Sequence, residues 1–311
     1  PGMMDYGPPE IVATGLRFPE GPVPMPDGSV LLVEIARGTL TRVALDGSLS
    51  VVAELGGGPN GLAIGPDGAA YVCNNGGFGW AELPGDLLLP IHAANDARCG
   101  SIQRVDLISG AVTTLYDHCD GQPLNGPNDL VFDSHGGFWF TDHGHVRASG
   151  RDHGALYYAR ADGSHISRQR AEMVGPNGVG LSPDGGTLYV AETTTARLWA
   201  MEIAGPGELA PPPPFMPGRL VGTPPAFRLF DSLAVEADGR ICIGTLVEGG
   251  ISLFTPAGEQ EFAALPGIGI TNIAFGGADL RDAYVTSSPD GILYRLRWPR
   301  PGLALHNRQF S

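Results

Sequence analysis

Positively charged residues are scarce in this chain of 311 residues. It has 19 Lys and Arg against 33 Asp and Glu, which gives a formal net charge of −14. Nucleic-acid binding requires clustered basic side chains that contact phosphates, so this composition argues against such a partner. Charged residues make up only 17% and hydrophobic residues 42% of the chain. That balance excludes an intrinsically disordered protein and leaves enough apolar material for a large core.

Cysteine is also rare, and no two cysteines form a CxxC pair. Cys73 and Cys242 lie in strand-like runs, where we expect them to pack as small hydrophobic residues. Cys99 and Cys119 flank one predicted strand pair, so the sequence is compatible with a disulfide between them and also with two free thiols. Nothing else in the sequence indicates an oxidising compartment.

Several targeting and catalytic signals are absent as well. No apolar run approaches the length that crosses a membrane, and residues 1–10 lack the basic and apolar regions of a signal peptide. We therefore expect a cytoplasmic protein without a membrane partner. The chain has no GxSxG nucleophile elbow, no GxxxxGK(S/T) phosphate loop and no HExxH zinc motif, so the corresponding enzyme classes are disfavoured.

What the chain does contain is a polar residue that recurs at one place in six similar segments. Each of the six precedes an apolar run, and a turn begins seven residues later. The six residues are Glu20, Asn60, Asn128, Asn177, Asp231 and Asn272. The corresponding turn residues are Asp27, Asp67, His135, Asp184, Asp238 and Asp279. A repeated register indicates a repeated structural unit.

Each unit reads as short β-strands joined by Gly-rich turns, in line with 47 glycines and 28 prolines. Units begin near residues 18, 58, 126, 175, 230 and 270. Four strands at a period of 40 or more residues predict an all-β, six-bladed β-propeller of four-stranded blades, forming a single domain over residues 1–311. The sixth unit has only three strands, so we expect residues 10–16 to supply its outer strand. Residues 76–100 and 204–228 are insertions, either loops over the site or surface loops.

The repeated register also predicts a chemistry. Inner strands of a propeller line its central tunnel, so one polar residue at the start of each strand produces a ring of side-chain oxygens in the tunnel mouth. Mixed carboxylate and amide oxygens suit Ca²⁺ or Mg²⁺, whereas the absence of Cys and His from the ring argues against structural zinc. The alternative is that each Asn caps a turn through its own side chain.

The chain resembles the SMP-30/gluconolactonase/regucalcin family of six-bladed propellers. The motifs that carry the resemblance are FPEGP at 18–22, GPND at 126–129, GFWFTD at 137–142, GPNGVGLSPDGGTLYVAET at 175–193 and FDSLAVEADG at 230–239. The resemblance implies one divalent cation held by Glu20, Asn128, Asn177 and Asp231. It also implies that Asp231 is the general base or nucleophile of a lactone hydrolase, with Asn60 and Asn272 in the pocket wall or the second shell.

One departure from the family concerns the substrate. Sugar-lactone hydrolases of this kind often carry an Arg two residues before the third-blade Asn, and that position here is Gly126. A less polar lactone or ester would fit Phe78, Trp80 and the apolar residues 87–91, if the insertion covers the pocket. In the TDHGHV motif, Asp142 and His143 are candidate substrate or second-shell residues. His143 and His145 are also candidate general acid/base residues, and the alternative for both is a purely local packing role.

The sequence therefore predicts a metal-dependent carboxylic-ester hydrolase, a lactonase with a small-molecule lactone or ester as its partner. Ca²⁺ is the favoured cation, with Mg²⁺, Mn²⁺, Fe²⁺ and Zn²⁺ as alternatives. Two other functions stay open: a phosphotriesterase or fluorophosphatase on the same metal, and a non-catalytic propeller with a structural ion. We expect a monomer or a small homo-oligomer.

Overall fold

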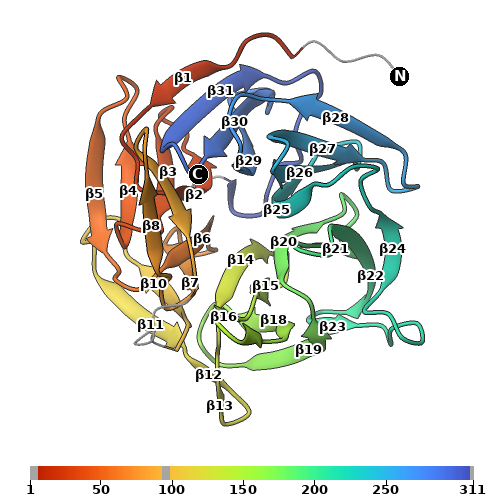
Figure 1. Ribbon diagram of the computed structural model, residues 1–311. Helices are drawn as coiled ribbons and strands as arrows, with labels where there is room; N and C mark the ends of the chain where they lie inside the picture. The colour runs from red at the N-terminus through yellow and green to blue at the C-terminus, as the bar shows by residue number, and fades with distance from the viewer. Residues whose placement is uncertain (1–5, 93–98, 309–311) are drawn as a thin grey trace.

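The computed structural model describes residues 6–92 and 99–308. Six small antiparallel sheets surround a central axis like the blades of a propeller (Figure 1). The strands nearest the axis contact one another in the cyclic order β2, β6, β14, β20, β25, β29 and back to β2. The predicted six-bladed, all-β fold is thus confirmed, and the described residues contain no α-helix. The prediction of one domain over 1–311 includes residues 1–5, 93–98 and 309–311, which lie outside the described residues.

The strands of each blade follow one another from the axis outward. Blade 1 contains β2 (Pro19–Pro24), β3 (Val30–Glu34), β4 (Thr39–Val43) and β5 (Leu49–Glu54). Blade 2 contains β6 (Pro59–Ile64), β7 (Ala70–Asn74), β10 (Ser101–Val105) and β11 (Val112–Tyr116). Blade 3 contains β14 (Pro127–Phe132), β15 (Gly137–Asp142), β18 (Gly154–Arg160) and β19 (Ile166–Met173).

Blade 4 contains β20 (Pro176–Leu181), β21 (Thr187–Glu192), β22 (Arg197–Gly205) and β24 (Arg219–Gly222), and β23 (Glu208–Leu209) also pairs with β22. Blade 5 contains β25 (Leu229–Val235), β26 (Ile241–Leu246), β27 (Gly250–Phe254) and β28 (Gln260–Ala264). Blade 6 contains β29 (Ile270–Gly276), β30 (Asp282–Ser287), β31 (Ile292–Arg297) and β1 (Glu10–Ala13). Three two-stranded hairpins complete the set: β8 (Trp80–Leu83) with β9 (Leu87–Pro90), β12 (His118–Cys119) with β13 (Gln122–Pro123), and β16 (Val146–Arg147) with β17 (Gly150–Arg151).

The N-terminal strand closes the ring of blades. β1 pairs antiparallel with β31, and Ile11 lies opposite Tyr294. The prediction that residues 10–16 supply the missing outer strand is therefore confirmed, with the strand ending at Ala13. Closure in this way gives the sixth blade its fourth strand and covers an edge that would otherwise be exposed.

The hydrophobic core lies between the blades. A separate cluster of buried side chains fills each interface between neighbouring blades, as between blades 2 and 3, where Tyr71 packs edge-on against Phe132 and Phe140 stacks on Tyr157. The second strand of each blade is packed on both faces, which explains its almost continuously apolar sequence, as in VLLVE of β3.

The C-terminal segment crosses the end of the tunnel opposite the ring residues. The Leu303 backbone N–H donates to the Val235 carbonyl at the end of β25, and the Asn307 amide donates to the Ile64 carbonyl at the end of β6. Both acceptors lie at the far ends of inner strands. The tail therefore spans that end from blade 5 to blade 2, and we expect substrates to enter from the other mouth.

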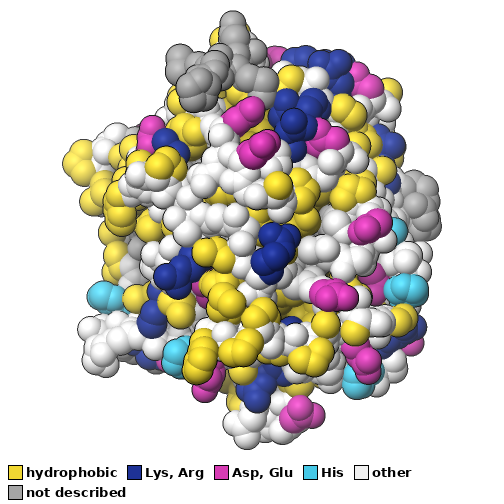
Figure 2. All heavy atoms as spheres, turned by 90° about the vertical axis from the view of Figure 1, so that its right-hand side faces the viewer, with side chains coloured by type: hydrophobic (Ala, Val, Ile, Leu, Met, Phe, Trp, Pro, Cys, Tyr) yellow, Lys and Arg dark blue, Asp and Glu magenta, His cyan; other side chains and the backbone are white. Residues whose placement is uncertain are grey.

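The outer surface carries acidic and basic side chains side by side. On the face shown in Figure 2, they are interspersed with hydrophobic ones. Arg228 pairs with Glu248 and Arg240 with Asp238. Among the described residues, no helix has the length and apolar character needed to cross a membrane. All four cysteines are free, and Cys99 and Cys119 form no disulfide in the structure.

Candidate metal centre

Each of the six ring residues stands at a β-bulge near the start of an inner strand. In β14, for example, the pairing register shifts between Pro127 and Leu130, on either side of Asn128. The register shifts around the ring residue in β6, β20 and β25 as well, directly after Glu20 in β2 and directly before Asn272 in β29. A bulge re-aims a side chain out of the regular alternation. The repeated Pro-Asn-Gly and related sequences therefore position the six side chains in the same way.

Glycine after the ring residue allows neighbouring inner strands to approach closely. A Cβ atom added to Gly61 would lie 2.4 Å from the Asn128 carbonyl oxygen, and one added to Gly178 would lie 2.7 Å from the Asp231 carbonyl oxygen. Only glycine fits such contacts. The close approach brings the side chains of adjacent blades together around the axis.

Glu20 is buried in the ring and one of its oxygens has no partner. Asn272 donates its amide N–H to Glu20 Oε2 at 2.7 Å, and the Gly21 backbone N–H donates to the same oxygen at 2.7 Å. Glu20 Oε1 accepts no hydrogen bond. A buried, unpaired carboxylate oxygen costs free energy unless something positive binds it. Asn272 is thus placed to hold the Glu20 carboxylate in the orientation that a metal ligand would need.

Asn128 offers a second buried oxygen without a partner, its Oδ1. The alternative that this Asn caps its own turn therefore fails here, whereas Asn272 Oδ1 does accept the Ile273 backbone N–H at 2.8 Å. Asn177 is fixed by its amide, which donates to Thr193 Oγ1 at 3.1 Å. Asn60 is buried at the same level of the ring, with 5% of its surface exposed.

Three carboxyl groups in or beside the ring have raised pKa values. Burial, together with the charge of Asp129, raises the pKa of Asp231 to about 8, although hydrogen bonds from Ser232 and Asn177 partly offset the effect. Burial raises the pKa of Asp129 to about 7. Burial and the charge of Asp231 hold the pKa of Glu20 well above its usual range. This concentration of negative charge favours a cation.

Asp129 was not among the residues predicted for the site. It occupies the register position where blades 1, 2 and 4 carry Gly21, Gly61 and Gly178. Its Oδ1 accepts the Leu130 backbone N–H at 2.8 Å. The signal in the sequence is the replacement of Gly by Asp in GPND, which places an additional acid beside the ring.

Asp142 belongs to a second repeated set, whose members hold the loops that lead into the inner strands. Asp142 accepts the backbone N–H groups of Asn125, Gly126 and Gly144 at 2.8, 2.7 and 3.0 Å. Glu34, Asn74 and Glu192, at the ends of β3, β7 and β21, each accept a backbone N–H from the corresponding loop. The structure therefore places Asp142 as a residue that positions the loop before Asn128.

The two histidines of the TDHGHV motif lie in different surroundings. His145 is buried, with Nδ1 bonded to Asn125 Oδ1 at 2.5 Å and Nε2 to the Asn75 carbonyl at 2.8 Å, so it links blades 2 and 3. His143 is partly buried next to Gly175 and Arg151. Burial and the charge of Arg151 lower the pKa of His143 to about 4, so its imidazole is neutral at pH 7.

The insertion after β7 forms an apolar wall on the opposite side of the mouth. Trp80 packs on Phe18, two residues before Glu20, with ring centroids 5.1 Å apart, and Phe78 meets Trp80 edge-on. The Leu88 backbone N–H reaches the Pro289 carbonyl of blade 6 at 2.8 Å. Residues 76–92 thus cover blade 1 beside Glu20, while 93–98 lie outside the described residues.

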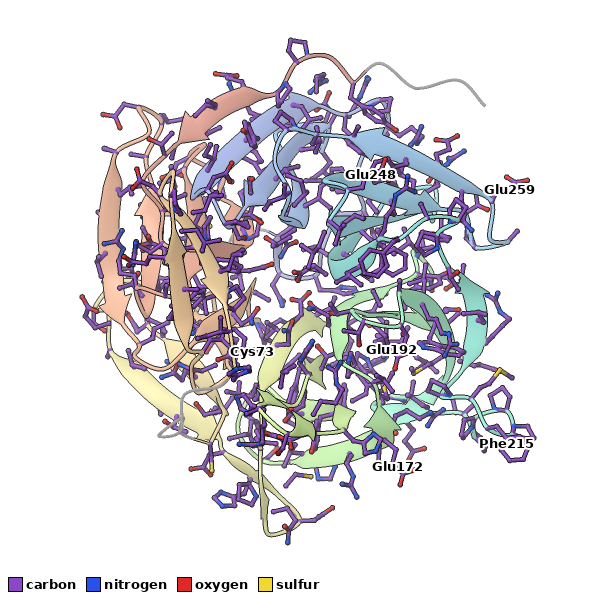
Figure 3. The ribbon with its side chains drawn as sticks, in the orientation of Figure 1. Cys73, Glu172, Glu192, Phe215, Glu248 and Glu259 are labelled. Atoms are coloured by element: carbon purple, nitrogen blue, oxygen red, sulfur yellow. The ribbon has the colours of Figure 1, made fainter. Side chains whose placement is uncertain are left out.

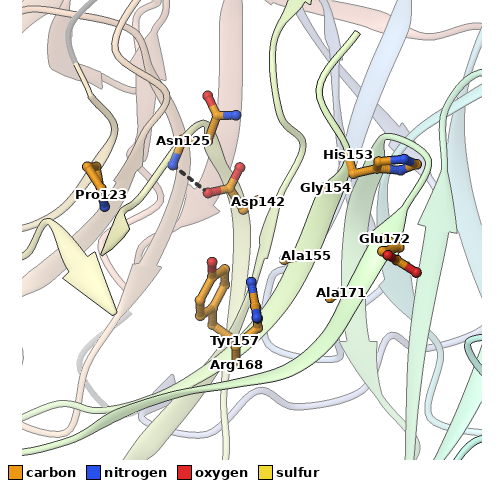
Figure 4. Close-up of a pocket in the computed structure, with 10 residues that line it drawn as sticks. All are labelled: Pro123, Asn125, Asp142, His153, Gly154, Ala155, Tyr157, Arg168, Ala171 and Glu172. Carbon is orange, nitrogen blue, oxygen red and sulfur yellow. Dashed lines mark hydrogen bonds between the residues drawn. The ribbon is translucent and has the colours of Figure 1, made fainter. Parts of the chain in front are cut away.

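Two further features lie away from the ring. The Pro-rich part of the second insertion extends from the outer edge of blade 4, where Phe215 is fully exposed (Figure 3). A cavity of about 280 Å³ opens on the side of blade 3 (Figure 4). Its lining includes Asp142, Tyr157, Arg168 and Glu172. It contains no ring residue, so we do not assign the site to it.

The donor set of the ring suits a cation that prefers oxygen ligands. Within residues 6–92 and 99–308, no three His, Cys, Asp or Glu side chains form a metal-binding group. The expected ligand set has only two such residues, Glu20 and Asp231, and two amides. The buried, unpartnered oxygens of Glu20 and Asn128 are what a hard cation would bind.

Comparison with known proteins identifies the family of the chain. The model of the SMP-30/gluconolactonase/LRE-like region matches residues 18–289. The chain belongs to this family. The family resemblance inferred from the sequence motifs is therefore confirmed.

Relatives and solved structures of the family match along most of the chain. A gluconolactonase from Zymomonas mobilis is 24% identical over 299 residues, covering 86% of this chain and 75% of that protein. The lactonase drp35 of Staphylococcus saprophyticus is 29% identical, covering 80% and 70%. A diisopropyl-fluorophosphatase from Loligo vulgaris is 26% identical, covering 59% and 60%. A gluconolactonase structure from Xanthomonas campestris superposes with a TM-score of 0.71 at 22% identity, covering 94% and 95%. A calcium-binding regucalcin from Agrobacterium tumefaciens gives 0.69 at 19% identity, covering 96% and 98%.

Proposed function

We propose that this chain is a divalent-metal-dependent lactone hydrolase whose cation is held by Glu20, Asn128, Asn177 and Asp231. The observation that carries the proposal is the pair of buried oxygens without partners, Glu20 Oε1 and Asn128 Oδ1, in a ring that also contains Asp231. Membership of the family and relatives named as lactonases support the lactone as the substrate.

Ca²⁺ is the cation that we favour. Two carboxylates and two amide oxygens form a donor set without nitrogen or sulfur, and Ca²⁺ accepts such ligands in flexible geometry. The calcium-binding character of the regucalcin neighbour supports the same choice. Mg²⁺, Mn²⁺, Fe²⁺ and Zn²⁺ are alternatives that metal reloading separates.

When bound, such a cation would polarise the lactone carbonyl and stabilise the negative charge that develops on its oxygen. The residues of the chain supply the remaining functions. Asp231 is partly exposed, whereas Glu20 and Asn128 are buried, so we assign to Asp231 the role of taking a proton from water or attacking the carbonyl carbon. Asn272 holds Glu20 in place, and Thr193 holds Asn177.

A second candidate function is the hydrolysis of phosphotriesters or fluorophosphates. The likeness to a diisopropyl-fluorophosphatase favours it, and the same ring would polarise a P=O group in the same way. We rank it below lactone hydrolysis because the longer matches are to proteins named as gluconolactonase and lactonase.

The test is hydrolysis by metal-stripped protein reloaded with Ca²⁺, Mg²⁺, Mn²⁺, Fe²⁺ or Zn²⁺, followed with a pH indicator over sugar lactones, alkyl lactones and a phosphotriester. Asp231→Asn should abolish acid release, whereas the control Asp238→Asn, in an exposed turn of the same blade, should not. Activity that persists without metal or in Asp231→Asn would overturn the proposal. No acid release from metal-loaded protein would favour a non-catalytic scaffold. The predicted cytoplasmic location and oligomeric state stay predictions.

A further inference from the structure

The mouth of the tunnel is polar on the side of blades 2 to 4. There the residue two positions before the ring residue is glycine, at Gly58, Gly126 and Gly175, where blade 1 has Phe18. At Gly175, with φ of 62°, an added Cβ would lie 2.7 Å from Arg151 Nη2 and 3.1 Å from His143 Nε2. The glycine therefore leaves room for these two side chains, which come from the loop between β15 and β18.

Arg151 is an arginine without an acidic partner. Its Nη1 donates to Thr194 Oγ1 at 2.6 Å, which anchors one end of the guanidinium. Its Nε is buried and has no hydrogen-bond partner. In the part of the chain that the structure describes, no carboxylate lies within ion-pair distance of Arg151. By contrast, Arg147 on the same hairpin pairs with Asp152.

The guanidinium of Arg151 keeps one donor group for a ligand. Nη1 is used by Thr194 and Nε is buried, so Nη2 is the group whose N–H can donate to a ligand. A guanidinium N–H binds a carboxylate oxygen through a charge-assisted hydrogen bond, which is stronger than its bond to a neutral hydroxyl. A carboxylate would also neutralise a positive charge that has no acidic partner in the described structure.

The backbone beside Arg151 lies close to the ring. Gly175 precedes Asn177 by two residues, which corresponds to about 7 Å of extended strand. Thr193 connects the two places, because its backbone N–H donates to the Gly175 carbonyl and its Oγ1 accepts from Asn177. A lactone with its carbonyl at the ring would therefore bring a substituent within reach of Arg151.

We propose that Nη2 of Arg151, with His143 beside it, binds a carboxylate substituent of the substrate, so that the preferred substrates are lactones that carry a carboxylate. This inference rests on the proposed lactonase function. The neutral imidazole of His143 adds a hydrogen-bonding group without a second positive charge. Arg151 would then supply from another loop the basic group that Gly126 lacks.

The kinetic test compares a γ-lactone that carries a carboxylate with its primary carboxamide. We expect wild-type protein to prefer the carboxylate, and Arg151→Gln to lower kcat/KM for it roughly 10- to 100-fold, mainly through KM. Hydrolysis of the carboxamide should change little, and Arg151→Lys should retain part of the preference. The matched control is Arg147→Gln on the same hairpin, which should leave the ratio of the two substrates unchanged.

A binding test separates this inference from the proposed function. Cyclopentanecarboxylate has a ring of the same size but no ester to cleave, and its binding is measured by calorimetry with cyclopentanecarboxamide as control. Loss of carboxylate binding in Arg151→Gln supports the subsite even if no lactone is hydrolysed. Lactone hydrolysis that depends on Asp231 but shows no carboxylate preference, or the same preference in Arg151→Gln, would overturn the subsite and leave the lactonase function intact. Circular dichroism confirms that each variant is folded.

Discussion

Replacing Asp231 by Asn should make the metal-free protein more stable at alkaline pH. The pKa of Asp231 is raised from 3.8 to about 8, so the folded state favours the protonated carboxyl. The contribution of Asp231 to the stability of the metal-free protein is therefore most favourable at low pH and is lost as the pH rises from about 4 towards 8. Each tenfold change in proton affinity corresponds to about 1.4 kcal/mol, so the cost above pH 8 is on the order of 5 kcal/mol. Asn carries no charge and avoids this cost.

The assay is urea denaturation in EDTA at pH 5, 7 and 8.5. The stabilisation by Asp231→Asn should be largest at pH 8.5 and small at pH 5. In saturating Ca²⁺ most of this difference should disappear, because the wild-type protein gains about 4 kcal/mol when the free ion is a thousand times its Kd. Asp46→Asn is the control: hydrogen bonds from Ser48 lower the pKa of this exposed Asp, so its loss should weaken folding slightly above pH 4. If Asp231→Asn destabilised the metal-free protein at pH 8.5, the carboxylate would not be an uncompensated buried charge.

Three further predictions address the cation, the apolar wall and the loops. Because the pKa values of Asp129 and Asp231 are raised to about 7 and about 8, Ca²⁺ binding at pH 7 should release protons. Calorimetry of Ca²⁺ binding in two buffers of different ionisation enthalpy checks this, because protons released by the protein are taken up by the buffer. Identical binding heats in the two buffers would contradict the prediction. Trp80→Ala should raise KM for alkyl-substituted lactones roughly tenfold, whereas Leu83→Ala, exposed on the same hairpin, should leave KM unchanged. Asp142→Asn should destabilise the fold by about 2–4 kcal/mol through its three backbone hydrogen bonds, and a more than tenfold loss of Ca²⁺ affinity would argue for a direct ligand role.

The arrangement of the blades was predictable because its causes are local and repeated. Asp-Gly turns, such as Asp27-Gly28, fix hairpins within each blade, and alternation of apolar residues identifies the strands. The outer strand of blade 6 followed from a count: one strand was missing at the C-terminal end and one was in excess at residues 10–16. The six ring residues were found for the same reason, since one register repeated six times.

Other parts of the site depend on contacts between segments that no local pattern relates. Asp129 differs from its counterparts by one residue type, and its effect on the pKa of Asp231 arises only once the inner strands are packed. His143 and His145 stand in one short motif, yet one lies at Gly175 and the other bridges two blades. Arg151 lies in a hairpin with no repeat in other blades. Its role arises from the space that Gly175 leaves across the blade interface.

The two sides of the mouth together would determine how a substrate lies over the ring. The C-terminal segment crosses the far end of the tunnel, so a substrate would reach the proposed metal ligands from the other mouth. Trp80 and Phe18 offer an apolar surface beside Glu20, and Arg151 offers a charged group beside Gly175. A lactone whose carbonyl is directed to the ring would then have its apolar carbon atoms on one side and its carboxylate on the other. Because three separate contacts of this kind cannot be made equally well by both mirror images, the geometry favours one enantiomer of a carboxylated lactone.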